Sequence, residues 1–251
     1  MLALAAPALH AQERHHTLIA IFAHPDDERI AGPALARYAR EGNHVYLVIA
    51  TDGSKGAAAH AHIPLGDSLA HVRAREALCA TQELGINAPI LLGLEDGGLA
   101  SFAALEKLRA GLRRIFAELK PDAIITFGPE GGTGHPDHRL VGDAVTDVVQ
   151  SGAPGAGDAL FYPALPAERM HDAPPARPTM NAALSKYLPV RIAFTEADFE
   201  ATHRAYACHA SQYTREQVDA NMLYMKHAFN GALPMRRWND ASPARDLFRR
   251  R

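Results

Sequence analysis

The stretch Thr17–Phe22, TLIAIF, is followed at once by residues 23–28, AHPDDE. An isoleucine-rich run of this length that ends before a proline predicts a buried strand. The acidic residues then lie at the carboxyl end of that strand, where ligand crevices form in open α/β sheets. We therefore expect an α/β fold, a Rossmann-like and mostly parallel sheet flanked by helices, with the active site at the carboxyl ends of the strands.

Strand-like and helical patterns alternate along the rest of the chain. Strands are predicted at residues 44–51, 89–92, 123–127, 159–162 and 190–194, and helices at residues 30–41, 67–84, 105–119, 137–149 and 196–209. We expect one domain over residues 17–251, since a chain of 251 residues suffices for one α/β core. Residues 151–189, rich in proline, glycine and alanine, are predicted to form a variable lid or wall.

The beginning of the chain and its cysteines bear on its location. Residues 1–16 are either a disordered start or the remnant of an export signal, because they begin with an apolar run but lack a charged n-region. No apolar run reaches the roughly 20 residues that a membrane span needs. We expect a cytoplasmic protein, with export from a truncated signal peptide as the alternative. Cys79 and Cys208 are expected to be reduced and buried, because two cysteines in helical patterns do not indicate a disulfide framework.

The charge of the chain argues against a nucleic-acid partner. The chain has 26 Lys and Arg against 28 Asp and Glu, a net charge of −2, so no overall field attracts a polyanion. The arginines at 245 and 249–251 are interpreted as a solvated tail. The expected partner is a small molecule, and homo-oligomerisation is left open by the sequence.

Residues 24–28 place one imidazole and three carboxylates at a single strand end. Without a cation the carboxylates would repel one another, and at least one would take up a proton. A divalent metal is the simplest explanation, with His24 and Asp27 as ligands and Asp26 pointing towards whatever the metal activates. A catalytic zinc site needs three protein ligands and an open position, so one ligand must come from elsewhere in the chain.

A second motif supplies a candidate for the third ligand. Residues 134–138, GHPDH, follow the strand-like run 123–127. His138 lies 114 positions after His24, a separation that two strands of one sheet can close. We predict that the two His-Pro-Asp motifs form one site. Two helix-capping turns would explain the aspartates but not the histidines.

The paired motifs resemble those of the PIG-L/LmbE family of zinc-dependent N-acetylglucosaminyl deacetylases. The resemblance extends over residues 17–217, well over half of the chain. It implies His24, Asp27 and His138 as the metal ligands, the same three that the spacing favours. It also implies an enzyme that removes an N-acetyl group from an N-acetylglucosamine-type amino sugar and releases acetate and a free amine.

The resemblance further implies roles for the residues between the ligands. Asp26 is expected to be the general base, and His135 the imidazole that stabilises the transition state, oriented by Asp137. One branch of the family carries a tyrosine where this chain has Thr133, which leaves the exact substrate open. Zn²⁺ is the expected cofactor, although nitrogen and oxygen ligands also suit Fe²⁺, Mn²⁺ or Co²⁺.

Three further residues match family positions near the substrate, and each has a plainer alternative. Arg73 is expected to contact the sugar or its acetyl group, unless it only pairs with Glu76 on a helix face. Asp96 is expected to accept from sugar hydroxyls, unless Asp-Gly is an ordinary turn. His209 is expected to approach the site from the far side, unless it is structural. Two functional alternatives stay open, an amidase for a larger sugar-thiol conjugate and a non-catalytic metal- or sugar-binding protein.

Overall fold

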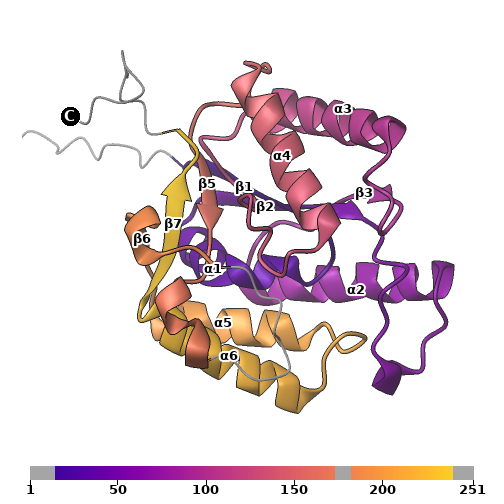
Figure 1. Cartoon of the computed structure of the whole chain (residues 1–251), viewed down its shortest axis with the longest axis vertical. Coiled ribbons are helices and arrows are strands. Elements are labelled where there is room, and N and C mark those ends of the chain that lie inside the picture. Colours follow the sequence, from indigo (N-terminus) through magenta and orange to yellow (C-terminus); the bar gives the residue numbers. More distant parts are fainter. Residues whose placement is uncertain (1–14, 173–181, 240–251) are drawn as a thin grey trace, which may run out of the picture.

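A seven-stranded sheet with the order β3-β2-β1-β4-β5-β7-β6 forms the centre of the protein (Figure 1). The computed structural model describes residues 15–172 and 182–239, so parts of the predicted start and lid and the arginine-rich tail lie outside the described residues. The strands are β1 (Thr17–Phe22), β2 (His44–Thr51), β3 (Ile90–Leu94), β4 (Ala123–Ile125), β5 (Leu160–Pro163), β6 (Val190–Ala193) and β7 (Ala232–Arg237).

Strand β1 is the middle of the parallel part of the sheet. It pairs with β2 on one side and β4 on the other, and both pairings are parallel. Its residues Ile19, Ile21 and Phe22 are fully buried, as expected for a strand covered on both faces. The predicted α/β fold with a mostly parallel sheet is confirmed, while β7 and the edge strand β6 pair antiparallel.

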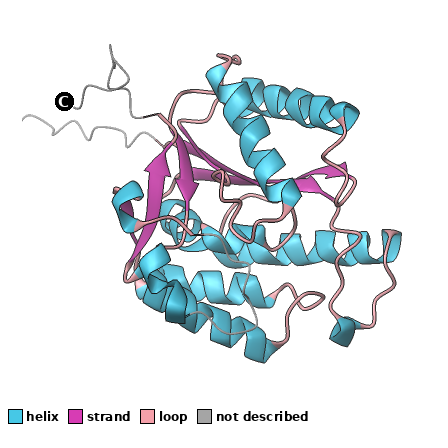
Figure 2. Ribbon diagram, in the orientation of Figure 1, coloured by secondary structure: helices cyan, strands magenta, loops and turns pink. Residues whose placement is uncertain are grey.

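Helices cover both faces of this sheet (Figure 2). In Figure 1, α3 and α4 lie on one face, α1 and α2 lie on the other, and α5 and α6 add an outer layer beneath them. Helix α5 packs against α1, α2 and α6. The helices are α1 (Gly32–Arg40), α2 (Asp67–Leu84), α3 (Phe102–Leu119), α4 (Pro136–Gln150), α5 (Glu196–Ala207) and α6 (Arg215–Phe229).

The structure departs from the predicted elements mainly at the carboxyl end of α5 and beyond. Helix α5 stops at Ala207, two residues earlier than predicted, and the chain then turns through residues 208–214. Helix α6 and strand β7 had not been predicted. Helix α6 begins with a capping box in which Thr214 and Gln217 satisfy each other's backbone N–H groups.

The two cysteines are bonded to each other, which corrects the expectation that they are reduced. Cys79 on α2 and Cys208 after α5 form a disulfide with an S–S distance of 2.01 Å and a Cα–Cα distance of 5.9 Å. They are 129 residues apart in sequence, so the bond links distant parts of the chain. Within the described residues, none of the helices is both long and apolar enough to cross a membrane.

Candidate active site

The two His-Pro-Asp motifs meet beyond the carboxyl ends of β1 and β4. His24 follows β1 after one residue, and His138 lies in the first turn of α4, whose first residue is Pro136. The chain leaves β1 towards β2 on one side and reaches β4 on the other, so this is a point where the strand order reverses. Such switch points are where open α/β sheets bind ligands.

The three predicted metal ligands lie within contact distance of one another. His24 Nδ1 is 3.1 Å from His138 Nε2 and 3.4 Å from Asp27 Oδ2, and His138 Nε2 is 3.2 Å from Asp27 Oδ1. Ligand atoms held about 2.0 to 2.2 Å from an ion at tetrahedral angles are roughly 3.3 to 3.6 Å apart. The spacing of this set therefore fits one small divalent cation.

The second nitrogen of each ligand histidine has its own partner. His138 Nδ1 lies 2.9 Å from the carbonyl oxygen of Gly131, and His24 Nε2 lies 3.1 Å from Asp96 Oδ1. The His138 contact is a hydrogen bond, so Nδ1 carries the proton of that ring, whereas the His24 contact is a charge contact without hydrogen-bond geometry, and only the proximity of Asp96 favours a proton on His24 Nε2. The lone pairs of His138 Nε2 and His24 Nδ1 would then point at each other. Outer partners of this kind orient histidines in metal sites.

The charges of the site show the same need for a cation. Burial alone would lower the pKa of His24, but hydrogen bonds to three neighbouring carboxylates raise this pKa to about 11. Burial would raise the pKa of Asp27, but the charge of His138 and the hydrogen bond of His24 lower it. The pKa of Asp96 is lowered to about 2 because, against burial, His24 and a backbone N–H stabilise the carboxylate. The carboxylates around His24 therefore favour a positive charge at this position, either a proton on His24 or a metal ion held by the neutral His24 and His138 rings.

Two overlapping groups of described residues could hold a metal ion by the proximity of their ligand atoms. One is His24, His135 and His138, and the other is His24, Asp96 and Asp137. Both contain His24, so they describe the surroundings of one site at the end of β1. His135 is exposed at its mouth, whereas the other members are buried.

Asp26 has a left-handed backbone, with φ of 110°, which is uncommon for a residue other than glycine. Its surroundings hold this conformation: its N–H donates to Glu28 Oε2 at 3.0 Å, and its carbonyl oxygen accepts from Arg29. Backbone strain of this kind persists where neighbouring contacts over-determine it, commonly at functional sites. The carboxylate of Asp26 lies on the wall of the cavity beside the ligand cluster.

His209, predicted to contact the substrate, lies behind the site instead. It is 0% exposed, and its Nε2 lies 2.6 Å from Glu28 Oε1. The other oxygen of Glu28 accepts from the backbone N–H of Asp26. His209 therefore supports the backbone of Asp26 through Glu28, and it does not line the cavity.

Arg73 lines the cavity, but its guanidinium is already engaged. It donates to the carbonyl oxygens of Pro25 and Gly53, and its Nη2 lies 3.5 Å from Asp26 Oδ1. Gly53 has φ of 65°, and a Cβ there would lie 2.7 Å from Arg73 Nη1, so the close approach requires glycine. Glu76, the alternative partner on the same helix, binds the backbone N–H and hydroxyl of Ser211.

Asp96 and Asp137 both face His24. Asp96 Oδ2 accepts from the backbone N–H of Lys55 at 2.9 Å, and its other oxygen lies beside His24. Asp137 Oδ2 accepts from the backbone N–H of Gly97 at 2.7 Å and lies 3.5 Å from His24 Nε2. These contacts favour an outer, orienting position for both carboxylates.

His135 is oriented by the backbone of Asp137. As the N-cap of α4, its Nδ1 accepts from the backbone N–H of Asp137 at 3.2 Å. The proton of a neutral ring is therefore on Nε2. The His135 ring stands edge-on to His24, with ring centroids 4.7 Å apart.

These side chains surround a cavity of about 200 Å³, here called the polar cavity. Its lining also includes Tyr213, which sequence reasoning missed and whose hydroxyl donates to Asp26 Oδ2 at 2.7 Å. Tyr213 lies four residues after His209, so its closeness to that family-matching residue was the available signal.

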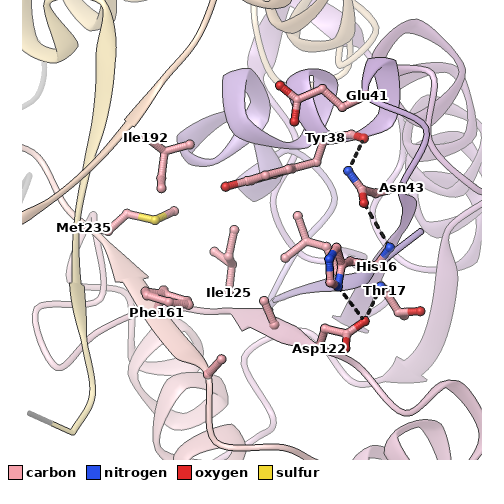
Figure 3. Close-up of a pocket in the computed structure, with 13 residues that line it drawn as sticks. His16, Thr17, Tyr38, Glu41, Asn43, Asp122, Ile125, Phe161, Ile192 and Met235 are labelled. Carbon is pink, nitrogen blue, oxygen red and sulfur yellow. Dashed lines mark hydrogen bonds and ion pairs between the residues drawn. The ribbon is translucent and has the colours of Figure 1, made fainter. Parts of the chain in front are cut away.

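A larger cavity, of about 600 Å³, opens at the amino ends of β1 and β4 and is here called the apolar cavity. Figure 3 shows Tyr38, Phe161 and Met235 around this space, with Asp122 and Thr17 hydrogen-bonded at its edge. Neither group of potential metal ligands includes a residue of its lining. Its position and chemistry separate it from the site predicted from the motifs.

Known structures share this fold. The N,N'-diacetylchitobiose deacetylase from Pyrococcus horikoshii superposes with a TM-score of 0.63 and 20% identity, covering 88% of this chain and 83% of the other. The 4-carboxy-2-hydroxymuconate hydratase from Pseudomonas putida KT2440 superposes with a TM-score of 0.64 and 15% identity, covering 91% and 98% of the two chains. A deacetylase and a hydratase thus have the same architecture, so the fold alone does not define the reaction.

Sequence comparison is more specific. A 1D-myo-inositol 2-acetamido-2-deoxy-α-D-glucopyranoside deacetylase from Streptomyces scabiei is 35% identical over 144 residues, 49% of this chain and 45% of the relative. A similarly named enzyme from Catenulispora acidiphila is 35% identical over 172 residues, 60% and 57% of the two chains. The chain spans about half the length of these curated relatives. The profile of the family described as GlcNAc-PI de-N-acetylase matches residues 19–149, a little over half of the chain and both motifs, and the chain therefore belongs to this PIG-L family.

Proposed function

We propose that this protein is a metal-dependent deacetylase that hydrolyses the N-acetyl group of an N-acetylglucosamine-type substrate. The observation that carries the proposal is the pair of facing nitrogens, His24 Nδ1 and His138 Nε2, 3.1 Å apart beside the carboxylate of Asp27. Two imidazole nitrogens that face each other in a buried, carboxylate-rich site need a positive charge between them, and the spacing of these nitrogens and the Asp27 carboxylate suits a metal ion in that place. The family relatives named above are deacetylases of an amino sugar linked to inositol.

Zn²⁺ is the proposed ion, with His24, Asp27 and His138 as its protein ligands. Two nitrogens and one oxygen with a neighbouring open space match catalytic zinc sites. Fe²⁺, Mn²⁺ or Co²⁺ would suit the same donors. When bound, such an ion polarises the acetyl carbonyl and lowers the pKa of a water molecule in its open position.

Asp26 is the proposed general base. Its carboxylate lies on the cavity wall and is not one of the three ligand groups, so it can take a proton from water that attacks the carbonyl carbon. It then returns this proton to the amide nitrogen as the carbon–nitrogen bond breaks, which gives acetate and a free amine. General base catalysis of this kind contributes about 10² to 10⁴ in rate.

His135 is proposed to stabilise the oxyanion. Its Nδ1 accepts from the backbone N–H of Asp137, so its Nε2–H is the group available for donation. Its exposed position at the mouth of the site gives it access to the acyl group. Removing one such donor commonly costs about 3 to 4 kcal/mol of transition-state stabilisation.

The substrate is proposed to enter the polar cavity as a single amino-sugar unit. About 200 Å³ accommodates a small group of this kind, whereas the rest of a larger molecule would stay outside. Arg73 and Asp96 line the cavity and are the proposed sugar contacts, although both also hold protein groups. His209 is not proposed as a contact because Glu28 covers its ring nitrogen.

Three further proposals concern the whole protein. Residues 17–251 are proposed to form a single deacetylase domain, with residues 151–189 as a lid or wall. The proposed partner is a small molecule, and self-association is left to measurement. A cytoplasmic location stays a prediction, and the Cys79–Cys208 bond favours its alternative, export to an oxidising compartment.

The test is release of acetate by the purified full chain. N-Acetylglucosamine, N,N'-diacetylchitobiose and an inositol-linked N-acetylglucosamine are each incubated with protein loaded with Zn²⁺, Mn²⁺, Fe²⁺ or Co²⁺, and with a chelator. We expect acetate and an equal amount of free amine from at least one of them, and loss of turnover with the chelator. Sugar and metal binding without acetate release would instead indicate a non-catalytic binding protein.

A further inference from the structure

The segment of residues 208–213, here called the anchor segment, contacts the loop of residues 24–28 at two of its residues, Asp26 and Glu28. It follows α5 and carries Tyr213, whose hydroxyl donates to Asp26 Oδ2 at 2.7 Å. It also carries His209, which holds Glu28, and Glu28 accepts from the backbone N–H of Asp26. One short segment therefore contacts both the carboxylate and, through one intermediary, the backbone of the proposed base.

Helix α2 fixes the position of the anchor segment. Arg73, Glu76 and Cys79 follow one another at intervals of three residues, so they lie along one side of the helix. Cys79 is bonded to Cys208, and both carboxylate oxygens of Glu76 accept from Ser211 at 2.7 Å. Gln212 adds a hydrogen bond from its side chain to the carbonyl oxygen of Gly56 at 2.6 Å.

The ring of Tyr213 is itself held in place. It packs edge-on against Tyr206, with ring centroids 4.8 Å apart, and the Arg29 guanidinium lies 5.6 Å from its centroid. A phenol on a fixed ring donates to one oxygen of a carboxylate with little loss of side-chain entropy. Its direction is therefore set before any substrate arrives.

The two oxygens of Asp26 differ in their surroundings. Oδ2 accepts from Tyr213, whereas Oδ1 lies 3.6 Å from Arg29 Nη1 and 3.5 Å from Arg73 Nη2, near two positive charges but beyond a normal hydrogen bond. The Tyr213 hydrogen bond at Oδ2 and the two arginines near Oδ1 thus set the orientation of the Asp26 carboxylate.

We propose that Tyr213 is a positioning residue for the general base Asp26, a role that rests on the proposed deacetylase function. Tyr213 supplies a phenol to the site from the carboxyl-terminal part of the chain. The loop just before the second motif carries Thr133, which has no phenol, on the cavity wall. Tyr213 acts on the reaction through Asp26 and makes no bond to the reacting atoms.

The test compares Tyr213→Phe with Tyr206→Phe in the full, metal-loaded chain. Both variants lose one phenol oxygen from the same aromatic pair, but the Tyr206 hydroxyl accepts from Asn221, whereas the Tyr213 hydroxyl donates to Asp26. We expect Tyr213→Phe to lower kcat for the release of acetate from N-acetylglucosamine about tenfold to a hundredfold, because a hydrogen bond to a charged group is lost. KM should change less than about twofold and the metal content should not change, since the ring still fills its place.

The same pair of variants separates this inference from the proposed function. Crystal structures should show the Asp26 carboxylate rotated in Tyr213→Phe and unmoved in Tyr206→Phe, whether or not any amide is hydrolysed. The inference is overturned if the carboxylate stays in place in both variants, if kcat of Tyr213→Phe stays within twofold of the wild type, or if its loss follows loss of metal. A wild-type protein that hydrolyses none of the amides, with Asp26 still rotated in Tyr213→Phe, would overturn the deacetylase function alone.

Discussion

The two ends of the parallel strands hold cavities of opposite character. At the carboxyl end, a cavity of about 200 Å³ is lined by histidines, aspartates and arginines. At the amino end, a cavity of about 600 Å³ is lined mainly by apolar side chains such as Ile125 and Phe161, with polar groups at its edge. Residues of β1 and β4 themselves line the apolar cavity, whereas the polar cavity is lined by residues of the loops and helices beyond the carboxyl ends of these strands.

The difference teaches that volume does not locate the chemistry in this fold. Burying His24, Asp27 and His138 together removes their hydration and so lowers the stability of the fold. Apolar side chains of similar volume would fill the same space with less loss of stability. Buried ionisable groups with displaced pKa values cluster at functional sites. The comparison predicts that equivalent substitutions have unequal effects at the two ends.

The largest difference is expected for aspartates. Asp26→Asn should lower turnover by about 10² to 10⁴, because the amide cannot take a proton, and asparagine tolerates the left-handed backbone. Asp122→Asn makes the same change beside the apolar cavity and should leave turnover within twofold. Acetate release and metal content are measured for both. Equal effects would remove the contrast between the two ends.

The disulfide between Cys79 and Cys208 lies outside the polar cavity and is expected to stabilise the fold around it. Cys79→Ser should lower the free energy of unfolding by about 2 to 4 kcal/mol, as for other native bonds that close long loops. Urea unfolding measures the change, and the wild-type protein with a reductant serves as the control that should reproduce it. Two titratable thiols in the untreated wild type would show that the bond is not formed.

A smaller effect is expected for the outer partner of His24. Asp96→Asn should weaken metal binding about tenfold to a hundredfold, because the amide orients and polarises the imidazole less well than a carboxylate. Glu95→Gln is the matched control, since Glu95 is adjacent but pairs with Lys55 at the surface. Metal affinity is measured by competition with a chromophoric chelator. Similar losses in both variants would point to a general charge effect.

The smallest effect is expected at the apolar cavity. Met235→Leu conserves most of the volume of a buried side chain on β7 and should cost less than about 1.5 kcal/mol of stability. Turnover and KM should not change, because the side chain lines the apolar cavity and not the polar cavity. A clear rise in KM would mean that the amino end also takes part in substrate binding.

Much of the fold and the ligand cluster could be predicted because their signals are local. An apolar run followed by His-Pro-Asp specifies both a strand and what lies at its end, and parallel pairing then brings His24 and His138 to the same edge. Helix α2 was predicted with its observed bounds, Asp67–Leu84, since Gly85 ends it in a left-handed conformation.

The parts that were missed depend on contacts between distant residues. A lone histidine carries no signal of direction, so nothing in the sequence told whether His209 faces the cavity or Glu28. The same holds for Tyr213, which reaches Asp26 across 187 positions, and for the cysteine pair, which is separated by 129. Helix spacing placed Arg73 and Glu76 on one face, but only the tertiary structure shows what that face meets.

The row of Arg73, Glu76 and Cys79 on α2 places a limit on the length of this helix. Each residue of an α-helix advances about 100° around the axis. One residue inserted between Arg73 and Cys79 would turn Cys79 away from Cys208, while Arg73 stayed beside the loop of residues 24–28. Substitutions at exposed positions of this helix leave these contacts intact. Insertions or deletions between Arg73 and Cys79 would break the link between the loop of residues 24–28 and the anchor segment.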